Sequence, residues 1–240
     1  KNILKLFIYL KIINRKNLEK IYQENLKKIE LENNKIKEIF EFKSKKIFFA
    51  FHSQPEMSTS LFAEDFDDQI RVLEKLNRKI ISEKFTLLAK EHPIQNQYQR
   101  DNMFFKRLKY LNNLHFINRS FSTKEILNSV DIIVTCSGTV GFEGLLLGKK
   151  CLLFGQSWYS KLHGVLQVKK NTSDFEILDF INKEFDYDQF YISLQNLYNS
   201  FKDGIVLKTY TPYVEQFNEM NNAKKIVEDF AEFLKNNQKI

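Results

Sequence analysis

The sequence predicts an α/β fold: a doubly wound, parallel, Rossmann-like sheet preceded by N-terminal helices. Short apolar runs such as "KKIFFAFH" and "DIIVTC" are typical of parallel strands that are buried on both faces. These runs alternate with helical segments over residues 46–240, which favours a parallel sheet covered on both sides. Five of the seven glycines fall in residues 136–155, where a strand, a turn, a helix and a further strand are predicted.

The first 46 residues differ from the rest in charge. They contain 13 Lys/Arg and 6 Asp/Glu, whereas 24 residues of each sign remain, so the net charge of +7 belongs to this segment. The neutral remainder gives no support to nucleic-acid binding. We expect an N-terminal helical segment, residues 1–45, that serves as a linker or as docking helices, and a Rossmann-like domain over residues 46–240.

Two helices are expected in the N-terminal segment. Residues 17–42 are expected to form one long polar helix, and residues 1–16 a shorter amphipathic one. The apolar run of the shorter helix falls far short of the roughly 20 residues that a bilayer requires. It is either a basic helix that contacts anionic lipid or a helix that docks on a partner domain or protein. We favour docking because one ordinary apolar face is formed by Leu4, Phe7, Ile8 and Ile12.

The elements of the main domain follow one another without a repeat. Strands are expected at "KKIFFAFH", "FTLLAKEH", "LHFIN", "DIIVTC", "KCLLF" and "GVLQV". Helices are expected over 65–82, within 94–110, at "STKEILNS" and "TVGFEGLLLG", and over 173–200 and 211–236. Ser122 and Glu125 have the spacing of a capping box. Cys136 and Cys151 are expected to be buried free thiols, and no metal-ligand spacing is present.

The loops that follow the strands hold most of the unusual residues. In doubly wound sheets, ligands bind beyond the carboxyl ends of the strands. Ser137, Gly138 and Thr139 form a small-residue turn before a helix, where unpaired backbone N–H groups and hydroxyls favour an anion. The alternative is that the two hydroxyls cap the helix while the glycines serve packing. Glu143 lies one helical turn beyond Thr139 and is suited to accept hydrogen bonds from a ribose.

A second candidate is "KEHP", residues 90–93. Pro93 ends the strand and holds His92 in an extended conformation at the edge of the sheet. An imidazole there can donate to a phosphate or stabilise a leaving group. Lys90 belongs to the same strand end and is a further candidate for nucleotide binding.

Two more loops carry candidate substrate contacts. In "HSQPEMSTS" the polar side chains Gln54, Glu56, Ser58 and Thr59 suit a sugar or an acceptor, and Glu56 is a candidate base. The same loop also fits a simple helix cap. In "GQSWYSKLHG", Trp158 and Tyr159 suit an apolar wall over a base or sugar ring, or a place in the core.

In order and spacing, these motifs resemble the bacterial capsule polysaccharide biosynthesis proteins related to the Kdo transferases. The resemblance covers residues 47–168 and includes "QPE", "KEHP", "SGTVGFEGLLLGKKCLLFG" and "WY". It implies the C-terminal, donor-binding half of a GT-B glycosyltransferase. In that family the HP motif, here His92 and Pro93, contacts the donor phosphate, the turn at Ser137–Thr139 binds it, and Glu143 matches the helix glutamate.

The resemblance also implies what the chain binds. The donor is a nucleotide sugar linked to CMP or UDP, such as CMP-Kdo, the acceptor is a glycan or glycolipid, and neither a cofactor nor a metal is required. The location is the bacterial cytoplasm, including the inner face of the inner membrane. Too few residues precede residue 47 for a full N-terminal Rossmann domain. Since that half usually carries the catalytic carboxylate, we expect donor binding to survive its absence better than catalysis.

Three functions are therefore compared. The leading hypothesis is a glycosyltransferase, or its donor-binding domain, in capsular or surface polysaccharide biosynthesis, with His92 and the 137–139 turn stabilising the departing phosphate. A nucleotide-sugar epimerase of the same fold is the second. The third is a non-catalytic partner in glycan assembly that docks through its first 42 residues. Nucleotide binding separates the first two functions from the third.

Overall fold

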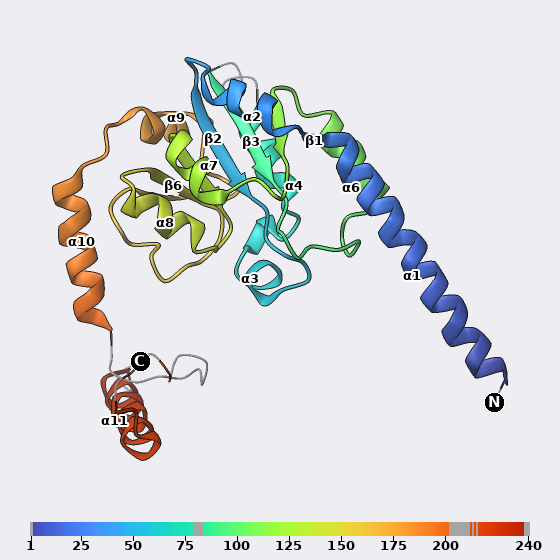
Figure 1. Ribbon diagram of the computed structural model, residues 1–240. Coiled ribbons are helices and arrows are strands. Elements are labelled where there is room, and N and C mark those ends of the chain that lie inside the picture. The colour runs from blue at the N-terminus through green and yellow to red at the C-terminus, as the bar shows by residue number, and fades with distance from the viewer. Residues whose placement is uncertain (1, 79–83, 202–211, 213, 215, 238–240) are drawn as a thin grey trace. The chain divides into compact units, whose positions relative to one another are not determined.

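The computed structural model describes residues 2–78, 84–201, 212, 214 and 216–237 (Figure 1). The chain divides into two compact units, Lys1–Tyr191 and Ile192–Ile240. The first unit contains a seven-stranded parallel sheet with the strand order β1-β4-β3-β2-β5-β6-β7. This arrangement confirms the predicted doubly wound α/β fold with N-terminal helices.

The bounds of the elements follow the predicted alternation closely. The strands are β1 (Glu30–Leu31), β2 (Lys45–Ala50), β3 (Phe85–Lys90), β4 (Leu114–Ile117), β5 (Ile132–Thr135), β6 (Lys150–Leu153) and β7 (Val165–Gln167). The helices are α1 (Asn2–Ile29), α2 (Asn33–Phe40), α3 (Met57–Ser60), η1 (Glu64–Phe66), α4 (Ile70–Leu76), α6 (Asn102–Lys109), α7 (Thr123–Ser129), α8 (Val140–Leu146), α9 (Asp174–Asn182), α10 (Tyr187–Ser200) and α11 (Glu219–Asn237). All six strands expected from the sequence are present.

The strand order places a topological switch between β2 and β5. From β2 the chain winds outward through β3 and β4, and it then returns to the other side of β2 and winds outward through β5, β6 and β7. Crossovers that leave in opposite directions open a crevice between the two loops at the carboxyl ends of the central strands. The sheet alone thus locates the expected ligand site.

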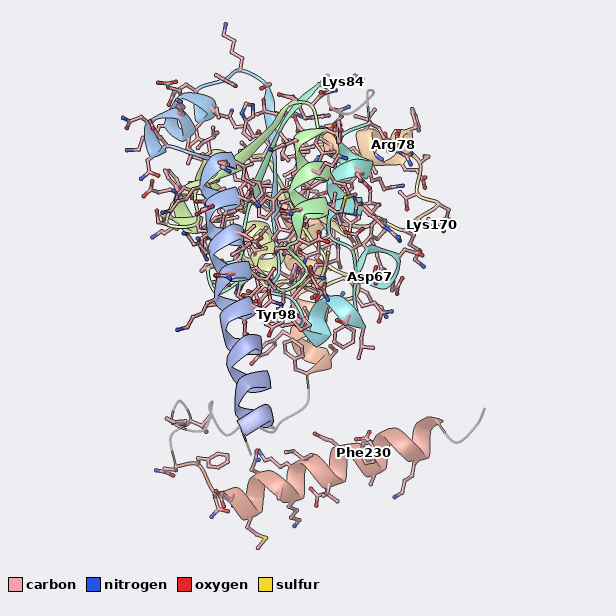
Figure 2. All side chains as sticks on the ribbon, turned by 90° about the vertical axis from the view of Figure 1, so that its right-hand side faces the viewer. Asp67, Arg78, Lys84, Tyr98, Lys170 and Phe230 are labelled. Carbon is pink, nitrogen blue, oxygen red and sulfur yellow. The ribbon has the colours of Figure 1, made fainter. Side chains whose placement is uncertain are left out.

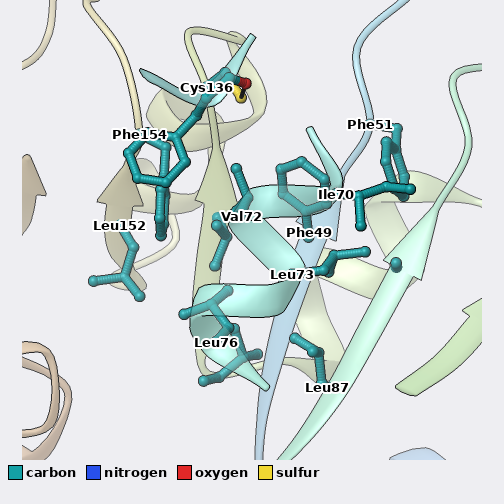
Figure 3. Packing of buried hydrophobic residues seen from close by; sticks show 14 of the residues in the cluster. Phe49, Phe51, Ile70, Val72, Leu73, Leu76, Leu87, Cys136, Leu152 and Phe154 are labelled. Carbon is teal, nitrogen blue, oxygen red and sulfur yellow. Dashed lines mark hydrogen bonds between the residues drawn. The ribbon is translucent and has the colours of Figure 1, made fainter. Parts of the chain in front are cut away.

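Helices cover both faces of the sheet, and each face has its own apolar core. The larger core lies beneath α1, α4, α6 and α9 and includes Phe49, Leu73, Phe104 and Ile177. The smaller core lies beneath α2 and α7 and includes Phe48 and Ile126. Neighbouring residues of one strand, such as Phe48 and Phe49, enter opposite cores because successive side chains of a strand point to opposite faces. Figure 3 shows α4 packed through Ile70, Val72, Leu73 and Leu76 against Phe49 and Leu87 of the sheet.

The predictions of a separate helix over residues 1–16 and of one helix over residues 17–42 are wrong, because α1 runs without a break through residue 16. Helix α1 ends at Ile29, and Glu30 and Leu31 form a short strand that pairs with Phe116 and Ile117 of β4. An ion pair stabilises this edge, because the Glu30 carboxylate lies 3.4 Å from Nε of Arg119. A helical pattern in the sequence did not reveal this pairing, since the partner strand lies far along the chain.

Part of the N-terminal segment packs inside the first unit. Tyr22 and Leu26 of α1 are 1% and 0% exposed and belong to the larger core, whereas Leu18 and Ile21 are about half exposed. This face therefore docks on its own chain. The side chains of residues 2–13 lie outside the described residues, so the docking role of the first helix stays a prediction, as does a domain boundary at residue 45.

Several helix ends are fixed by the residues that precede them. The Ser122 hydroxyl accepts from the backbone N–H of Glu125 at 3.4 Å, which is the serine half of the capping box predicted for α7. Ser173 and Glu176 form a complete capping box at α9. The segment 65–82 contains η1 and α4 as its described helices, with residues 79–83 outside the described part. Helix α11 begins at Glu219, later than expected, and most of residues 202–215 are likewise undescribed.

Both cysteines are buried free thiols, as predicted. Burial raises the pKa of Cys136 to about 12 and also raises that of Cys151, so both stay protonated at neutral pH. Among the helices that the structure describes, none has the length and apolar character needed to cross a membrane.

The second unit contains α11, and three of its described apolar side chains are exposed. Met220, Val227 and Phe230 are 79%, 65% and 62% exposed, and Phe230 is labelled on this helix in Figure 2.

In the first unit, Arg78, also labelled in Figure 2, forms an ion pair with Asp174 of α9 at 3.1 Å.

Candidate functional site

A cavity of about 230 Å³ lies at the carboxyl ends of β2, β3 and β5, where the switch in strand order predicts a ligand site. Three segments far apart in the sequence meet there because their strands are neighbours in the sheet. Six of the residues singled out from the sequence line this cavity: Glu56, Lys90, His92, Pro93, Gly138 and Thr139. The predicted meeting of the HP motif and the glycine turn is therefore present in the structure.

His92 follows β3 and lines the cavity, and one of its ring nitrogens has no hydrogen-bond partner. Its ring atom Nδ1 is buried and is one of two such side-chain atoms without a hydrogen-bond partner among the described residues. The backbone is fixed, since His92 N donates to Oε1 of Glu91 at 2.9 Å. A buried polar atom without a partner is costly and calls for a ligand or water. Of the predicted residues, His92 is thus the best placed to bind an anion.

The strand end that carries His92 rests on a buried ion pair. Glu91 and Arg100 have side chains that are 0% and 1% exposed, and Arg100 Nε donates to Glu91 Oε2 at 2.7 Å. The guanidinium also donates to the side chain of Gln54 at 2.7 Å and stacks 4.5 Å from the ring centroid of Phe104. This network links the loops after β2 and β3. Neither charged residue was predicted from the sequence, although "KEHP" contains Glu91.

Lys90 lines the cavity, and its ammonium is hydrogen-bonded to the segment at the start of α7. It donates to the backbone oxygen of Phe121 at 2.7 Å and to the hydroxyl of Thr123 at 2.9 Å. Desolvation lowers the pKa of Lys90. The ammonium of Lys90 adds positive charge to the cavity wall. Its hydrogen bonds also connect the end of β3 to the start of α7.

The glycine turn after β5 is tightly packed and internally hydrogen-bonded. A Cβ on Gly138 would lie 2.9 Å from Oγ1 of Thr135 and 3.0 Å from Cε1 of His52, so no side chain fits there. The expectation of several free N–H groups is wrong in part, because those of Cys136 and Ser137 donate to Nε2 of His52 and that of Gly138 donates to Oγ1 of Thr135. The anion site predicted at this turn stays a prediction, and it can use only backbone N–H groups beyond that of Gly138, at the start of α8.

Thr139 and Glu143 share one face of α8, as their spacing predicts. The Thr139 hydroxyl donates to the Glu143 carboxylate at 3.1 Å, and both residues are exposed. The pair can turn toward a hydroxyl-bearing ligand without disturbing the core. The ribose role of Glu143 stays a prediction.

The other predicted contacts lie apart from the cavity. Ser137 and Trp158 line a neighbouring hollow of about 670 Å³, where Trp158 packs on Phe142 with ring centroids 4.6 Å apart. Tyr159 is fully buried, and its hydroxyl donates to the backbone oxygen of Gly138. It therefore supports the turn from below instead of forming an exposed wall.

In the loop after β2, burial limits two of the predicted contacts. Gln54 is 6% exposed and holds Arg100, and Thr59 is 0% exposed and donates to the backbone oxygen of Glu56 at 3.1 Å. The side chain of Ser58 lies outside the described part of the chain. Of the described side chains in this group, Glu56 alone lines the cavity.

His52 also lines the cavity and was not predicted as a site residue. It ends the run "KKIFFAFH" and stands at the start of the polar loop, one position beyond Phe51 of the core. Burial lowers its pKa to about 4; His92 contributes in the same direction and Glu56 opposes it. The available signal was a histidine directly after a central strand, the same signal that pointed to His92.

The pKa of His52 predicts a loss of stability in acid. The unfolded imidazole binds its proton near pH 6.5 and the folded one near pH 4, so the unfolded state holds more protons between these values. Relative to a His52→Gln variant, we expect the wild type to lose about 3 kcal/mol of unfolding free energy between pH 7 and pH 4. Urea unfolding at several pH values measures this, and parallel curves for the two proteins would contradict it.

The sequence of the chain matches a known family over most of its length. Residues 4–175 match the model of the family described as capsule polysaccharide biosynthesis protein. The chain belongs to this family. A comparison with curated protein sequences gives no significant match.

Three solved structures are similar to this capsule-family chain at low identity. The beta Kdo 2,4 transferase KpsC of Thermosulfurimonas dismutans is 19% identical with a TM-score of 0.40, over 69% of this chain and 54% of KpsC. The UDP-GlcNAc 2-epimerase of Methanocaldococcus jannaschii is 12% identical with a TM-score of 0.44, over 70% and 50%. The MnaA–UDP co-structure from S. aureus is 14% identical with a TM-score of 0.43, over 67% and 42%. The chain thus spans about half the length of these proteins.

Proposed function

We propose that this chain is the donor-binding part of a glycosyltransferase in capsule polysaccharide biosynthesis. One observation carries the proposal: the unsatisfied imidazole of His92 and the turn at Gly138 and Thr139 line one cavity at the switch point of the sheet. Membership in the capsule polysaccharide biosynthesis family supports the biological setting. The ligand is a nucleotide sugar, with CMP-linked Kdo as the first candidate and UDP-linked sugars as the second.

The size of the cavity indicates which part of the donor it holds. At about 230 Å³ it is smaller than the roughly 300–1,000 Å³ of a site for a whole drug-sized ligand. It accommodates a phosphate with an attached sugar, while the base lies outside. His92 then donates to a phosphate oxygen. The positive end of the α8 dipole and the ammonium of Lys90 stabilise the negative charge of the phosphate.

The proposed reaction is displacement of the nucleotide at the anomeric carbon. A bond forms from the acceptor hydroxyl oxygen to this carbon, and the bond from the carbon to the phosphate oxygen breaks, so the nucleotide leaves with its phosphate. Donors aimed at the departing oxygen lower the barrier because negative charge develops there. Glu56, which lines the same cavity, is the candidate to accept the proton of the acceptor hydroxyl. The proposal uses no metal ion.

Calorimetry with CMP and UDP tests this function directly. We expect saturable binding of at least one of the two nucleotides at millimolar concentration or below, with competition by the corresponding nucleotide sugar. Transfer to a glycan acceptor, followed by the release of free nucleotide, then separates a transferase from an enzyme that isomerises the free nucleotide sugar. Failure of both nucleotides to bind would overturn the proposed function and favour a non-catalytic partner.

A further inference from the structure

His52 joins the ends of the two central strands through a single ring nitrogen. Its Nε2 lies 2.8 Å from Oγ1 of Thr135, and it accepts from the backbone N–H groups of Cys136 at 3.2 Å and Ser137 at 3.4 Å. Thr135 Oγ1 itself accepts from the N–H of Gly138 at 3.0 Å, so its own hydrogen is available to His52. Three consecutive backbone N–H groups after β5, those of Cys136, Ser137 and Gly138, are thus hydrogen-bonded to one imidazole and one hydroxyl.

These partners assign the protonation state of the ring. A nitrogen that accepts two backbone N–H bonds carries no hydrogen, so the proton of the neutral ring lies on Nδ1. The titratable groups that face it are His92 at the end of β3 and Glu56 in the loop after β2, and the thiol of Cys136 stays neutral. Burial lowers the pKa of His52 to about 4, which agrees with an uncharged acceptor at neutral pH.

The backbone that carries the ring is also fixed. His52 N donates to Oε1 of Gln69 at 2.7 Å, and Nε2 of Gln69 donates to His52 O at 3.1 Å. Arg100 reaches the same carbonyl at 3.3 Å. His52 and Gln69 are 8% and 1% exposed. The side chain of Gln69 holds the backbone of His52, and the turn after β5 binds its ring. His52 therefore couples the position of the end of β2 to that of the turn.

We propose that His52 is a positioning residue that sets the turn after β5 for anion binding, by acting through its Nε2 acceptor and not by contacting the ligand. Gly138 packs directly against the imidazole, because a Cβ at this position would lie only 3.0 Å from the ring. The ring therefore contacts the backbone of the turn itself. The binding consequence of this role rests on the proposed function, whereas the hydrogen-bond role of the ring does not.

Two amide substitutions separate an acceptor that holds the turn from a direct ligand contact. The Oε1 atom of glutamine can occupy the place of the imidazole Nε2, whereas the amide of the shorter asparagine reaches only the place of Nδ1. We therefore expect His52→Gln to keep the CMP dissociation constant within about threefold of the wild type, and His52→Asn to raise it about tenfold or more. The reverse order, equal losses, or no loss in either variant would overturn the proposal.

A second measurement needs no ligand. In ¹⁵N NMR spectra of the wild type at neutral pH, we expect the His52 ring to carry its proton on Nδ1, and the amide hydrogens of Cys136 and Ser137 to exchange slowly. Exchange of these two amides should stay slow in His52→Gln and become faster in His52→Asn, relative to amides of β6 as an internal control. A proton on Nε2, or fast exchange in the wild type, would overturn the proposal even if no variant could be folded.

These experiments also distinguish the positioning role of His52 from the proposed function. If the wild type binds neither CMP nor UDP, the proposed function fails, and the ring tautomer and amide exchange still decide the role of His52. If the wild type binds CMP and the order of the two amide variants is reversed, the function stands and the positioning role fails.

Discussion

Replacing His92 with alanine is expected to weaken the binding of CMP by about 10- to 150-fold. Loss of a hydrogen bond to a charged group costs about 1.5–3 kcal/mol, which corresponds to this range in the dissociation constant. The folded protein should be affected little, because Nδ1 of His92 has no partner to lose. A large loss of affinity with nearly unchanged thermal unfolding therefore identifies a ligand-binding group, and calorimetry at fixed ionic strength measures it.

A matched control comes from His163, an exposed histidine between β6 and β7 that does not line the cavity. His163→Ala should leave the affinity for CMP unchanged. Thr139→Val, which removes the other candidate donor at the cavity, should weaken binding as His92→Ala does, although its hydroxyl has Glu143 as an alternative partner. Wild-type affinity in both His92→Ala and Thr139→Val would remove the assignment of the site.

The largest loss of stability is expected when Arg100 is replaced by methionine. This change leaves the carboxylate of Glu91 buried without its counter-ion, which costs about 3–5 kcal/mol in comparable buried pairs. The loops after β2 and β3 would also lose their common partner, since Arg100 binds Gln54 and the carbonyl of His52. Urea unfolding should show a lower midpoint, and CMP binding should weaken as well because His92 is attached to this strand end.

Two comparisons isolate the buried charge as the cause. The double variant Glu91→Met/Arg100→Met removes both charges and should recover most of the lost stability, since well-packed apolar replacements of buried pairs are often neutral. Arg107→Met breaks ion pairs that are about one-third exposed, with Asp68 and Glu74, and should cost at most about 1 kcal/mol. If the double variant is less stable than Arg100→Met, the account of this pair is contradicted.

The sheet could be predicted because its strands are short, apolar and separated by helices. Phe48 and Phe49 enter opposite cores, so the strand is apolar on both faces and reads as a continuous run in the sequence. The edge strand β1 could not be predicted in this way, since two residues carry no periodicity and their pairing with Phe116 and Ile117 is set by tertiary contact.

The meeting of His92 with Gly138 and Thr139 in one cavity could be predicted, because parallel strands end at the same edge of a sheet. The internal hydrogen bonds of the site could not. That the N–H groups of the turn donate to His52, and that Arg100 stabilises the loop after β2, depends on side-chain positions that sequence spacing does not specify. Tyr159 shows the same limit, since the sequence left an apolar wall and a place in the core as alternatives, and the structure places this residue in the core.

The central claim is that one anion touches both His92 and the turn before α8. Titration of ¹⁵N-labelled protein with CMP, followed by NMR, tests it most directly. We expect the ring signals of His92 and the backbone amides of Thr139 and Val140 to shift together, with one dissociation constant for all of them. Shifts that are confined to one of the two groups, or that follow two different dissociation constants, would contradict a single shared ligand.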